Sequence, residues 1–195
     1  MDVRRATPLD IAGVLQLQSA SFIGNLSAED RAEGFVSVEF TAQQFDAMAM
    51  DCALIVAVEQ QHVQGYLCSA SVDYCRQFPL LAALIQRFPE LRYAKRPLDS
   101  YRTFVYGPVC IARSQHGRGL LRSLYWELLR AIGARYDLGV ALISKENPRS
   151  FEAHVRKLGM THVGEYEFRG QQYNILAFLV PNRHDQPNAP DNISF

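Results

Sequence analysis

The sequence lacks several features that mark whole classes of protein. No stretch approaches the roughly 18 uncharged apolar residues that cross a bilayer, and the opening MDVRRATPLD holds no apolar signal core. Lys plus Arg and Asp plus Glu both number 20, so the chain has no excess positive charge for a broad nucleic-acid-binding face. We therefore expect a cytoplasmic protein with neither a membrane nor a nucleic-acid partner.

Metal-binding and disulfide patterns are absent too. The four cysteines form no Cys-x-x-Cys pair and lie in or beside apolar runs, and the scattered histidines show no His-Glu-x-x-His spacing. In a cytosolic chain this pattern is typical of buried thiols. We predict no metal site and four free thiols, at Cys52, Cys68, Cys75 and Cys110.

The remaining composition is that of one globular domain. The chain has 195 residues, 48% of them hydrophobic, and shows no internal repeat. Residues 1–180 carry the apolar patterns of strands and helices. Residues 181–195, PNRHDQPNAPDNISF, are polar and rich in proline, which predicts a disordered tail. We expect a single domain over residues 1–180.

Apolar periodicity predicts an ordered series of strands and helices. We expect strands at 3–6, 53–58, 63–72, 104–111, 139–144, 163–168 and 173–180, and helices at 9–22, 28–33, 42–50, 79–85, 121–129 and 149–158. A strand–helix–strand centre predicts two parallel neighbouring strands. The fold class is thus α/β (α+β), with one mixed central sheet of six to seven strands flanked by helices and parallel in its middle.

The most informative stretch is FVYGPVCIARSQHGRGLLRSLYWELL, residues 104–129. It combines an apolar strand, a polar turn with Gly117 and Gly119, and an amphipathic helix whose apolar face is predicted to open at Leu121. The first N–H groups of a helix have no intrahelical partner, and glycine permits close backbone approach, so this turn can hold a phosphate. Alone, however, a Gly-x-Gly turn is more often a simple tight turn.

Together with its flanking motifs, this stretch resembles the GNAT N-acetyltransferase superfamily, whose members bind acetyl-CoA. The opening VRRATPLDI and the hairpin ending VQGYL are similar to the family's first strands. His116-Gly117-Arg118-Gly119-Leu120-Leu121 resembles its pyrophosphate loop, (Arg/Gln)-x-x-Gly-x-(Gly/Ala). Asn147-Pro148-Arg149-Ser150, followed by Leu158-Gly159-Met160, resembles its Asn-x-x-(Ser/Ala) helix. The motifs follow the family's order across roughly residues 1–180.

The resemblance has three departures. His116 stands where the family has Arg or Gln, and Leu121 where it has Gly or Ala. A second register, SQHGRG at 114–119, restores both glycines but loses the basic residue. We prefer the first register, because Leu121 then opens the apolar helix face. The helix before Gly159 is also one residue longer than usual.

The resemblance implies acetyl-CoA as co-substrate. The strand at 109–111 would pair with the pantetheine arm and polarise the thioester carbonyl through a backbone N–H, and the turn at 116–121 would hold the pyrophosphate. Arg118 and Arg122 would add positive charge to the pyrophosphate site. The alternative interpretation is that both are solvated arginines of the helix. The implied cofactor-binding residues are Val109, Cys110, Ile111, His116, Gly117, Arg118, Gly119, Leu120, Leu121, Arg122, Asn147 and Ser150.

The acceptor chemistry is less well marked. Many family members place a glutamate base on the central strand, but YGPVCI here has no carboxylate. Glu39 is our candidate base, and Tyr106 is expected to line the acceptor pocket. His154 stands where the family often has a tyrosine acid; an imidazole can give or take a proton, although a packed helix histidine is the competing interpretation.

We therefore expect acetyl transfer to a primary amine. A small-molecule acceptor is favoured because the aromatic segment 35–45, either core packing or a lid, and the insert 74–100 are placed to close the acceptor site. The alternative is a non-catalytic acyl-CoA-binding or regulatory domain, favoured by the missing strand carboxylate and by Leu121. A continuous tunnel from the 109–111 strand to Tyr106 would discriminate between them. A homodimer through the final hairpin is left open.

Overall fold

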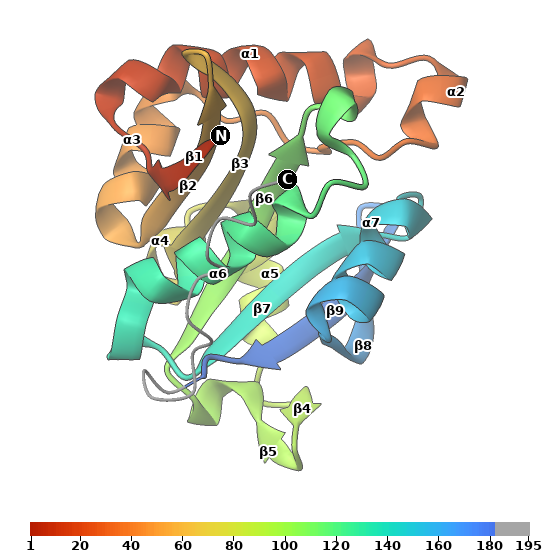
Figure 1. Ribbon diagram of the computed structural model, residues 1–195. Helices are drawn as coiled ribbons and strands as arrows, with labels where there is room; N and C mark the ends of the chain where they lie inside the picture. Colours follow the sequence, from red (N-terminus) through yellow and green to blue (C-terminus); the bar gives the residue numbers. More distant parts are fainter. Residues whose placement is uncertain (182–195) are drawn as a thin grey trace.

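A computed structural model describes residues 1–181, so the predicted tail lies outside the described residues except for Pro181. A seven-stranded sheet dominates the fold, in the order β1-β2-β3-β6-β7-β9-β8 (Figure 1). The strands are β1 (Asp2–Arg5), β2 (Ala53–Glu59), β3 (His62–Ser71), β6 (Thr103–Ile111), β7 (Leu138–Ser144), β8 (Thr161–Phe168) and β9 (Gln171–Leu179). Only β6 and β7 pair in parallel among these neighbours. The predicted mixed α/β fold is confirmed.

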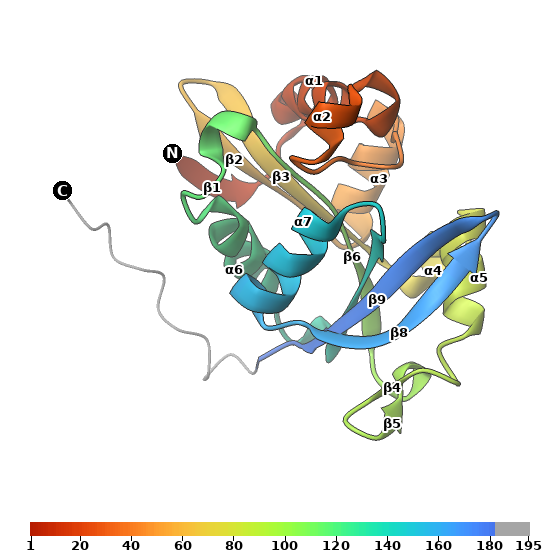
Figure 2. The same cartoon turned by 90° about the vertical axis from the view of Figure 1, so that its right-hand side faces the viewer.

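Helices cover both faces of the sheet (Figure 2). They are α1 (Ile11–Ser21), α2 (Ala28–Arg31), α3 (Ala42–Asp51), α4 (Val72–Cys75), α5 (Pro79–Gln86), α6 (Leu120–Ile132) and α7 (Pro148–Glu152). Thr41 is the N-cap of α3, since its hydroxyl accepts from the N–H of Gln44. Among the described helices none is long and apolar enough to cross a membrane.

Each face of the sheet has its own apolar core, because successive strand side chains point to opposite faces. On β6, Val105 belongs to the core shared with α1, α3 and α5, whereas Phe104 and Tyr106 belong to the core under α6. Tyr106 is thus presented to the α6–α7 side of the sheet. This alternation determines which side chains of β6 lie on the α6–α7 side of the sheet.

The two central strands separate halfway along their length. Thr103–Tyr106 pair with Leu138–Ala141, and beyond this point β6 continues along β3 while β7 continues along β9. Gly107 and Pro108 lie together opposite the single residue Cys68, which is a β-bulge. Gly107 has a φ of +105°, a conformation that favours glycine, and the Gly107–Pro108 peptide is cis. A bulge re-aims its strand, so the sheet opens here.

Two helix details differ from the sequence prediction. Leu120, not Leu121, is the first core residue of α6, and Leu121 is only half-buried, because the helix begins one residue earlier than its apolar spacing suggested. The predicted 149–158 helix is α7 followed by a π-helical turn at Ala153–Lys157. A π turn absorbs one additional residue, which accounts for the helix being one residue too long.

The predicted role of the insert 74–100 is wrong. Its α5 lies behind the β8–β9 hairpin in Figure 2, and the short β4 (Arg92–Tyr93) and β5 (Arg96–Pro97) lie below the hairpin. Arg87 donates to the carbonyl of Glu165, and Leu91 packs against Gly164. In the described chain, no residue of this insert lines a cavity at the sheet opening.

Candidate active site

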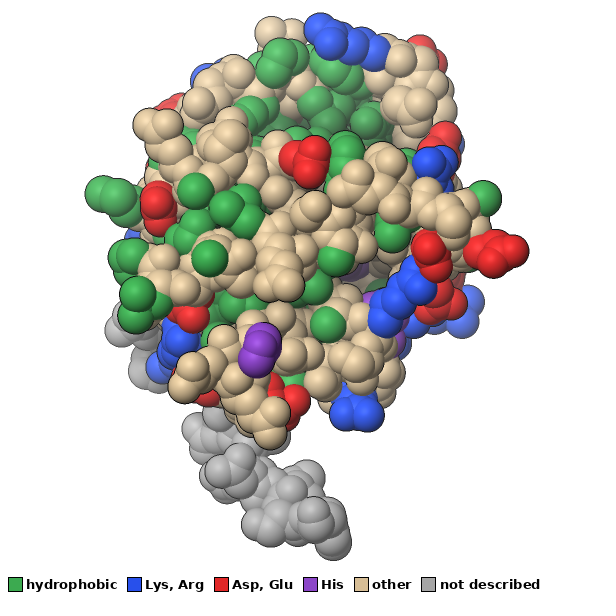
Figure 3. Space-filling view, turned by 90° about the horizontal axis from the view of Figure 1, so that it is seen from above, with side chains coloured by type: hydrophobic (Ala, Val, Ile, Leu, Met, Phe, Trp, Pro, Cys, Tyr) green, Lys and Arg blue, Asp and Glu red, His purple; other side chains and the backbone are tan. Residues whose placement is uncertain are grey.

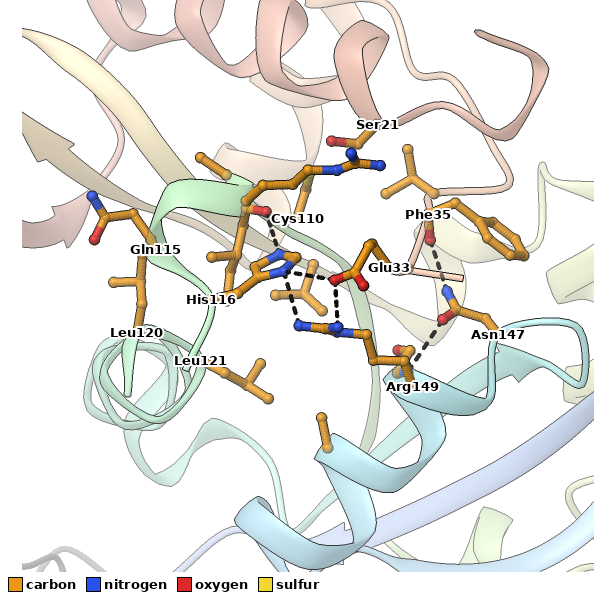
Figure 4. A pocket seen from close by; sticks show the side chains of 18 of the residues that line it. Ser21, Glu33, Phe35, Cys110, Gln115, His116, Leu120, Leu121, Asn147 and Arg149 are labelled. Atoms are coloured by element: carbon orange, nitrogen blue, oxygen red, sulfur yellow. Dashed lines mark hydrogen bonds and ion pairs between the residues drawn. The ribbon is translucent and has the colours of Figure 1, made fainter. Parts of the chain in front are cut away.

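A cleft of about 670 Å³ lies where β6 and β7 diverge (Figure 4). Its walls come from the end of α1, the end of β6, the start of α6, α7 and the segment 33–36. Of the predicted cofactor-binding residues, all but Arg118 line it; they are Val109, Cys110, Ile111, His116, Gly117, Gly119, Leu120, Leu121, Arg122, Asn147 and Ser150. The fold therefore gathers residues of three separate motifs around one cavity.

The glycines of the turn are required by backbone conformation. Gly117 and Gly119 have φ values of +79° and +83°, and a Cβ on either would meet nothing within 4 Å. Space is therefore available, and the left-handed φ is what excludes other residues. Gly119 is the N-cap of α6, so the unpartnered first N–H groups of that helix open at the cleft.

The cleft carries positive charge although the whole chain has none in excess. Among the described residues that line it, Glu33 is the one carboxylate, against five Lys and Arg side chains: Arg113, Arg122, Arg149, Arg156 and Lys157. A polyanionic ligand suits this distribution, because guanidinium groups and helix N-termini both favour phosphate.

His116 is held by the turn that contains it. Its Nε2 lies 3.0 Å from the carbonyl oxygen of Ile111, which can only accept, so Nε2 donates. Its Nδ1 then accepts from Nη2 of Arg149, at 3.0 Å. Nη1 of the same guanidinium lies 2.5 Å from Oε2 of Glu33. Neither Arg149 nor Glu33 is among the site residues predicted from the sequence. Arg149 lies within a quoted motif, but no local pattern singles out Glu33.

Asn147 connects two walls of the cleft. Its Oδ1 accepts from the N–H of Ser150 at 3.1 Å, capping α7, and its Nδ2 donates to the carbonyl of Phe35 at 2.9 Å. Val36 in turn donates to the carbonyl of Ser21 at the end of α1. The segment 33–36 is thereby held between α1 and α7, across the cleft.

A second, smaller cavity of about 90 Å³ adjoins the cleft at the sheet opening. The two cavities share six lining residues: Phe35, Val36, Val109, Asn147, Ser150 and His154. The smaller one adds Tyr106 and the Gly107–Pro108 bulge, and none of its described lining residues is Asp, Glu, Lys or Arg. The smaller cavity therefore has a lining without charged side chains, and it adjoins the positively charged cleft.

His154 lies at this junction with a free nitrogen. Its side chain is buried, and Nδ1 donates to the carbonyl of Ser150 at 2.7 Å, which leaves the lone pair on Nε2. Nε2 has no hydrogen-bond partner among the described residues. Burial lowers the pKa of His154 below its ordinary value of 6.5, because desolvation disfavours the imidazolium. The position suits a proton acceptor.

Tyr106 is both packed and unpartnered. Its ring contacts those of His154, Tyr125 and Phe178, and its hydroxyl has no partner among the described residues. Burial raises the pKa of this phenol well above 10, so it stays protonated and can donate. It lines the smaller cavity, as its predicted role requires.

Glu39 and Cys110 lie away from this junction. Glu39 is exposed and lines neither cavity, so its position does not favour the predicted role as base.

Cys110 points its Sγ toward the α1 side, 3.8 Å from the carbonyl of Leu17, and burial raises the pKa of its thiol to about 11. All four cysteines are free and buried, as predicted. No group of three metal-ligating side chains occurs in residues 1–181.

Known structures share this fold, although no protein-family model and no curated protein sequence matches the chain. A putative acetyltransferase, yncA, from Salmonella typhimurium, with its cofactor acetyl-CoA, is 19% identical over 98% of both chains, with a TM-score of 0.58. A GNAT superfamily phosphinothricin acetyltransferase from Sinorhizobium meliloti, in complex with acetyl-CoA, is 14% identical over 97% of this chain and 94% of its own, with a TM-score of 0.59.

A ribosomal-protein-alanine N-acetyltransferase from Brucella melitensis is 18% identical over 92% of this chain and 99% of its own, with a TM-score of 0.58. The names of these three proteins give two different acceptors in two cases and no acceptor in the third. Together they show that the chain has the GNAT acetyltransferase fold.

Proposed function

We propose that the protein is a GNAT-superfamily N-acetyltransferase that moves an acetyl group from acetyl-CoA to a primary amine of a small molecule. The observation that carries the proposal is the unpartnered Nε2 of His154, buried at the junction of a basic cleft and a neutral cavity. This arrangement supplies a proton acceptor between a site for a polyanion and a site for an uncharged group.

The residues of the cleft fit acetyl-CoA. The turn at 116–121 and its neighbouring arginines would hold the pyrophosphate, and Val109, Cys110 and Ile111, which have no β7 partner, would lie along the pantetheine arm. Asn147 and Ser150 would contact the same arm from α7. Bound there, the cofactor supplies an acyl group on a thioester.

The chemistry of the chain's own residues is a proton relay. The amine nitrogen bonds to the acyl carbon and the carbon–sulfur bond breaks, so one proton leaves the nitrogen and one is needed at the sulfur. Nε2 of His154 accepts the first and returns it to the second, which balances the reaction. Tyr106, with its hydroxyl free to donate, positions the group held in the smaller cavity.

The smaller cavity favours a slim acceptor, since its volume is about 90 Å³ and its lining is neutral. Its junction with the cleft also favours an enzyme over a non-catalytic acyl-CoA-binding domain, because a cofactor and an acceptor can meet there. Four expectations stay predictions. They are Glu39 as the base, a cytoplasmic location, a single domain over residues 1–180, and a homodimer through the β8–β9 hairpin.

The test is calorimetric titration with acetyl-CoA, followed by thiol release across a panel of small primary amines. Binding together with amine-dependent thiol release is the expected result. Binding without release on any amine would favour the non-catalytic domain. Absence of binding would overturn the assignment of the cleft and the activity with it.

A further inference from the structure

The segment 28–36 crosses the mouth of the cleft and is tied to it by charge. Asp30 on α2 pairs with Arg113 at 2.8 Å, and Glu33 pairs with Arg149 at 2.5 Å. Figure 3 shows side chains of both signs gathered at the end of the molecule where Figure 1 places α2. These pairs join a segment of the N-terminal half to two positively charged rims of the cleft.

Glu33 occupies a position that an anionic ligand would need. Its Oε2 lies 2.5 Å from Arg149 and 3.9 Å from Nδ1 of His116, which belongs to the phosphate-holding turn (Figure 4). It is the one carboxylate in the described lining of the cleft. A guanidinium fork matches a phosphate as well as it matches a carboxylate, and two anions repel each other at this distance.

The Glu33–Arg149 ion pair is easily broken. The side chains of Arg149 and Glu33 are 44% and 48% exposed, and pairs of this kind contribute little net stability because water and salt compete for both partners. A ligand with several phosphate charges therefore displaces the carboxylate at small cost. Breaking the pair also removes one of the ties on the segment 33–36.

We infer that Arg149 is a ligand for the cofactor's phosphates and that Glu33 is their built-in competitor, so that cofactor binding frees the segment that roofs the acceptor cavity from its charged tie to α7. The inference rests on the proposed function for the identity of the anion. Phe35, Val36 and Ser37 line the smaller cavity, and the hydrogen bond from Asn147 to Phe35 is then the main remaining tie to α7.

The first test is calorimetric titration of Glu33→Gln with CoA, which needs no turnover. Removing the competitor is expected to tighten CoA binding about threefold to tenfold. Glu29→Gln is the matched control, because Glu29 is an exposed carboxylate of the same segment, outside the lining and outside every ion pair of the described residues. Equal effects of the two variants would overturn the inference in favour of a general charge effect.

A double-mutant cycle tests whether Glu33 acts through Arg149. Arg149→Gln is expected to weaken CoA binding about threefold to tenfold, and adding Glu33→Gln to it is expected to give no further gain. A gain as large as in the wild-type background would overturn the pairing. Circular dichroism of each variant shows whether it is folded.

Hydrogen exchange follows the segment itself. CoA is expected to quicken exchange of the amides of residues 33–36, and Glu33→Gln is expected to show the quicker exchange without CoA. Slower exchange with CoA would overturn the release. If CoA binds and the cycle behaves as described but no amine is acetylated, the transfer activity fails while this inference stands. If CoA does not bind the wild type or Glu33→Gln, both fail.

Discussion

The imidazole of His154 lies at 85° to the phenol ring of Tyr106, with their centroids 5.5 Å apart. Nε2 of the first and the hydroxyl of the second are both buried, and neither has a hydrogen-bond partner among the described residues. A buried polar atom without a partner costs about 1–3 kcal/mol. Both residues line the same small cavity, so a ligand bound there is placed next to two side chains that lack hydrogen-bond partners.

Replacing His154 tests its role as proton acceptor. His154→Gln keeps a polar side chain of similar length but removes the base, so kcat is expected to fall about 10²-fold or more while the Kd for CoA stays within about twofold. Steady-state thiol release and calorimetry measure the two quantities. His162→Gln, an exposed histidine on β8, is the control and should change neither. A kcat within threefold of wild type would remove His154 from the mechanism.

The pH profile follows from the direction of the pKa shift. Because burial lowers the pKa of His154 below 6.5, its imidazole is neutral and able to accept a proton at lower pH than an exposed histidine. We expect the acid limb of kcat/KM to have its midpoint below pH 6.5. The same shift makes the histidine's contribution to folding stability full above pH 6.5 and lost as the pH falls toward the lowered value. A midpoint above 6.5 would contradict this assignment.

Tyr106→Phe separates packing from chemistry. The ring contacts remain and an unpartnered hydroxyl is removed, so the free energy of unfolding is expected to stay equal or rise by up to about 1 kcal/mol. If the hydroxyl positions the reacting group, kcat/KM falls about tenfold. Tyr66→Phe is the matched control, since the Tyr66 hydroxyl is also buried and unpartnered but lines neither cavity. Equal activity of both variants would assign Tyr106 to the core alone.

The features of the fold that depend on short-range sequence patterns could be predicted from the sequence. The seven strands, the glycine turn before α6 and the final hairpin all have short-range sequence patterns, and each appears close to where it was expected. The sequence showed that the helix before Gly159 has one additional residue. It did not show that this residue is accommodated by a π turn that contains His154. Backbone hydrogen bonding within a helix is not encoded in apolar spacing, so only the structure shows it.

The long-range part of the site was not predictable in the same way. Glu33 and Arg149 are separated by 116 residues, and no periodicity relates them. Glu39 lies among aromatic residues, yet its side chain is exposed while that of the next residue, Phe40, is buried. The side of an irregular segment that faces a cavity depends on tertiary contacts, such as the hydrogen bonds that join Gln18 to the backbone of Phe40.

The glycine turn can be tested against a turn with the same strain elsewhere. Gly119→Ala places a Cβ at a φ of +83°, and Gly170→Ala does so at +80° in the β8–β9 turn; neither Cβ meets an atom within 4 Å. Each is expected to cost about 1–2 kcal/mol of unfolding free energy in urea titrations. Only Gly119→Ala is expected to weaken CoA binding, by about fivefold or more. Equal CoA affinities would show that the turn does not hold the phosphates.

The Arg4–Asp10 pair makes a stability prediction that is independent of function. Asp10 accepts from both Nη1 and Nη2 of Arg4, at 2.7 and 3.0 Å, and from the N–H of Thr7. The hydrogen bond from Arg4 is the main reason that the pKa of Asp10 falls from 3.8 to about 2. A lowered carboxyl pKa stabilises the fold above the unfolded pKa, and this contribution is lost as the pH falls from about 4 toward 2.

Asp10→Asn should therefore lower the free energy of unfolding by about 1–2 kcal/mol at pH 7 and by roughly half as much at pH 3, measured by urea titration. Asp73→Asn is the control, because the Asp73 side chain is 96% exposed and its pair with Arg76 spans 3.7 Å. Its effect should stay within about 0.5 kcal/mol at both pH values. An Asp10→Asn loss that is the same at pH 3 as at pH 7 would mean that packing, and not the carboxylate charge, explains the contribution of Asp10.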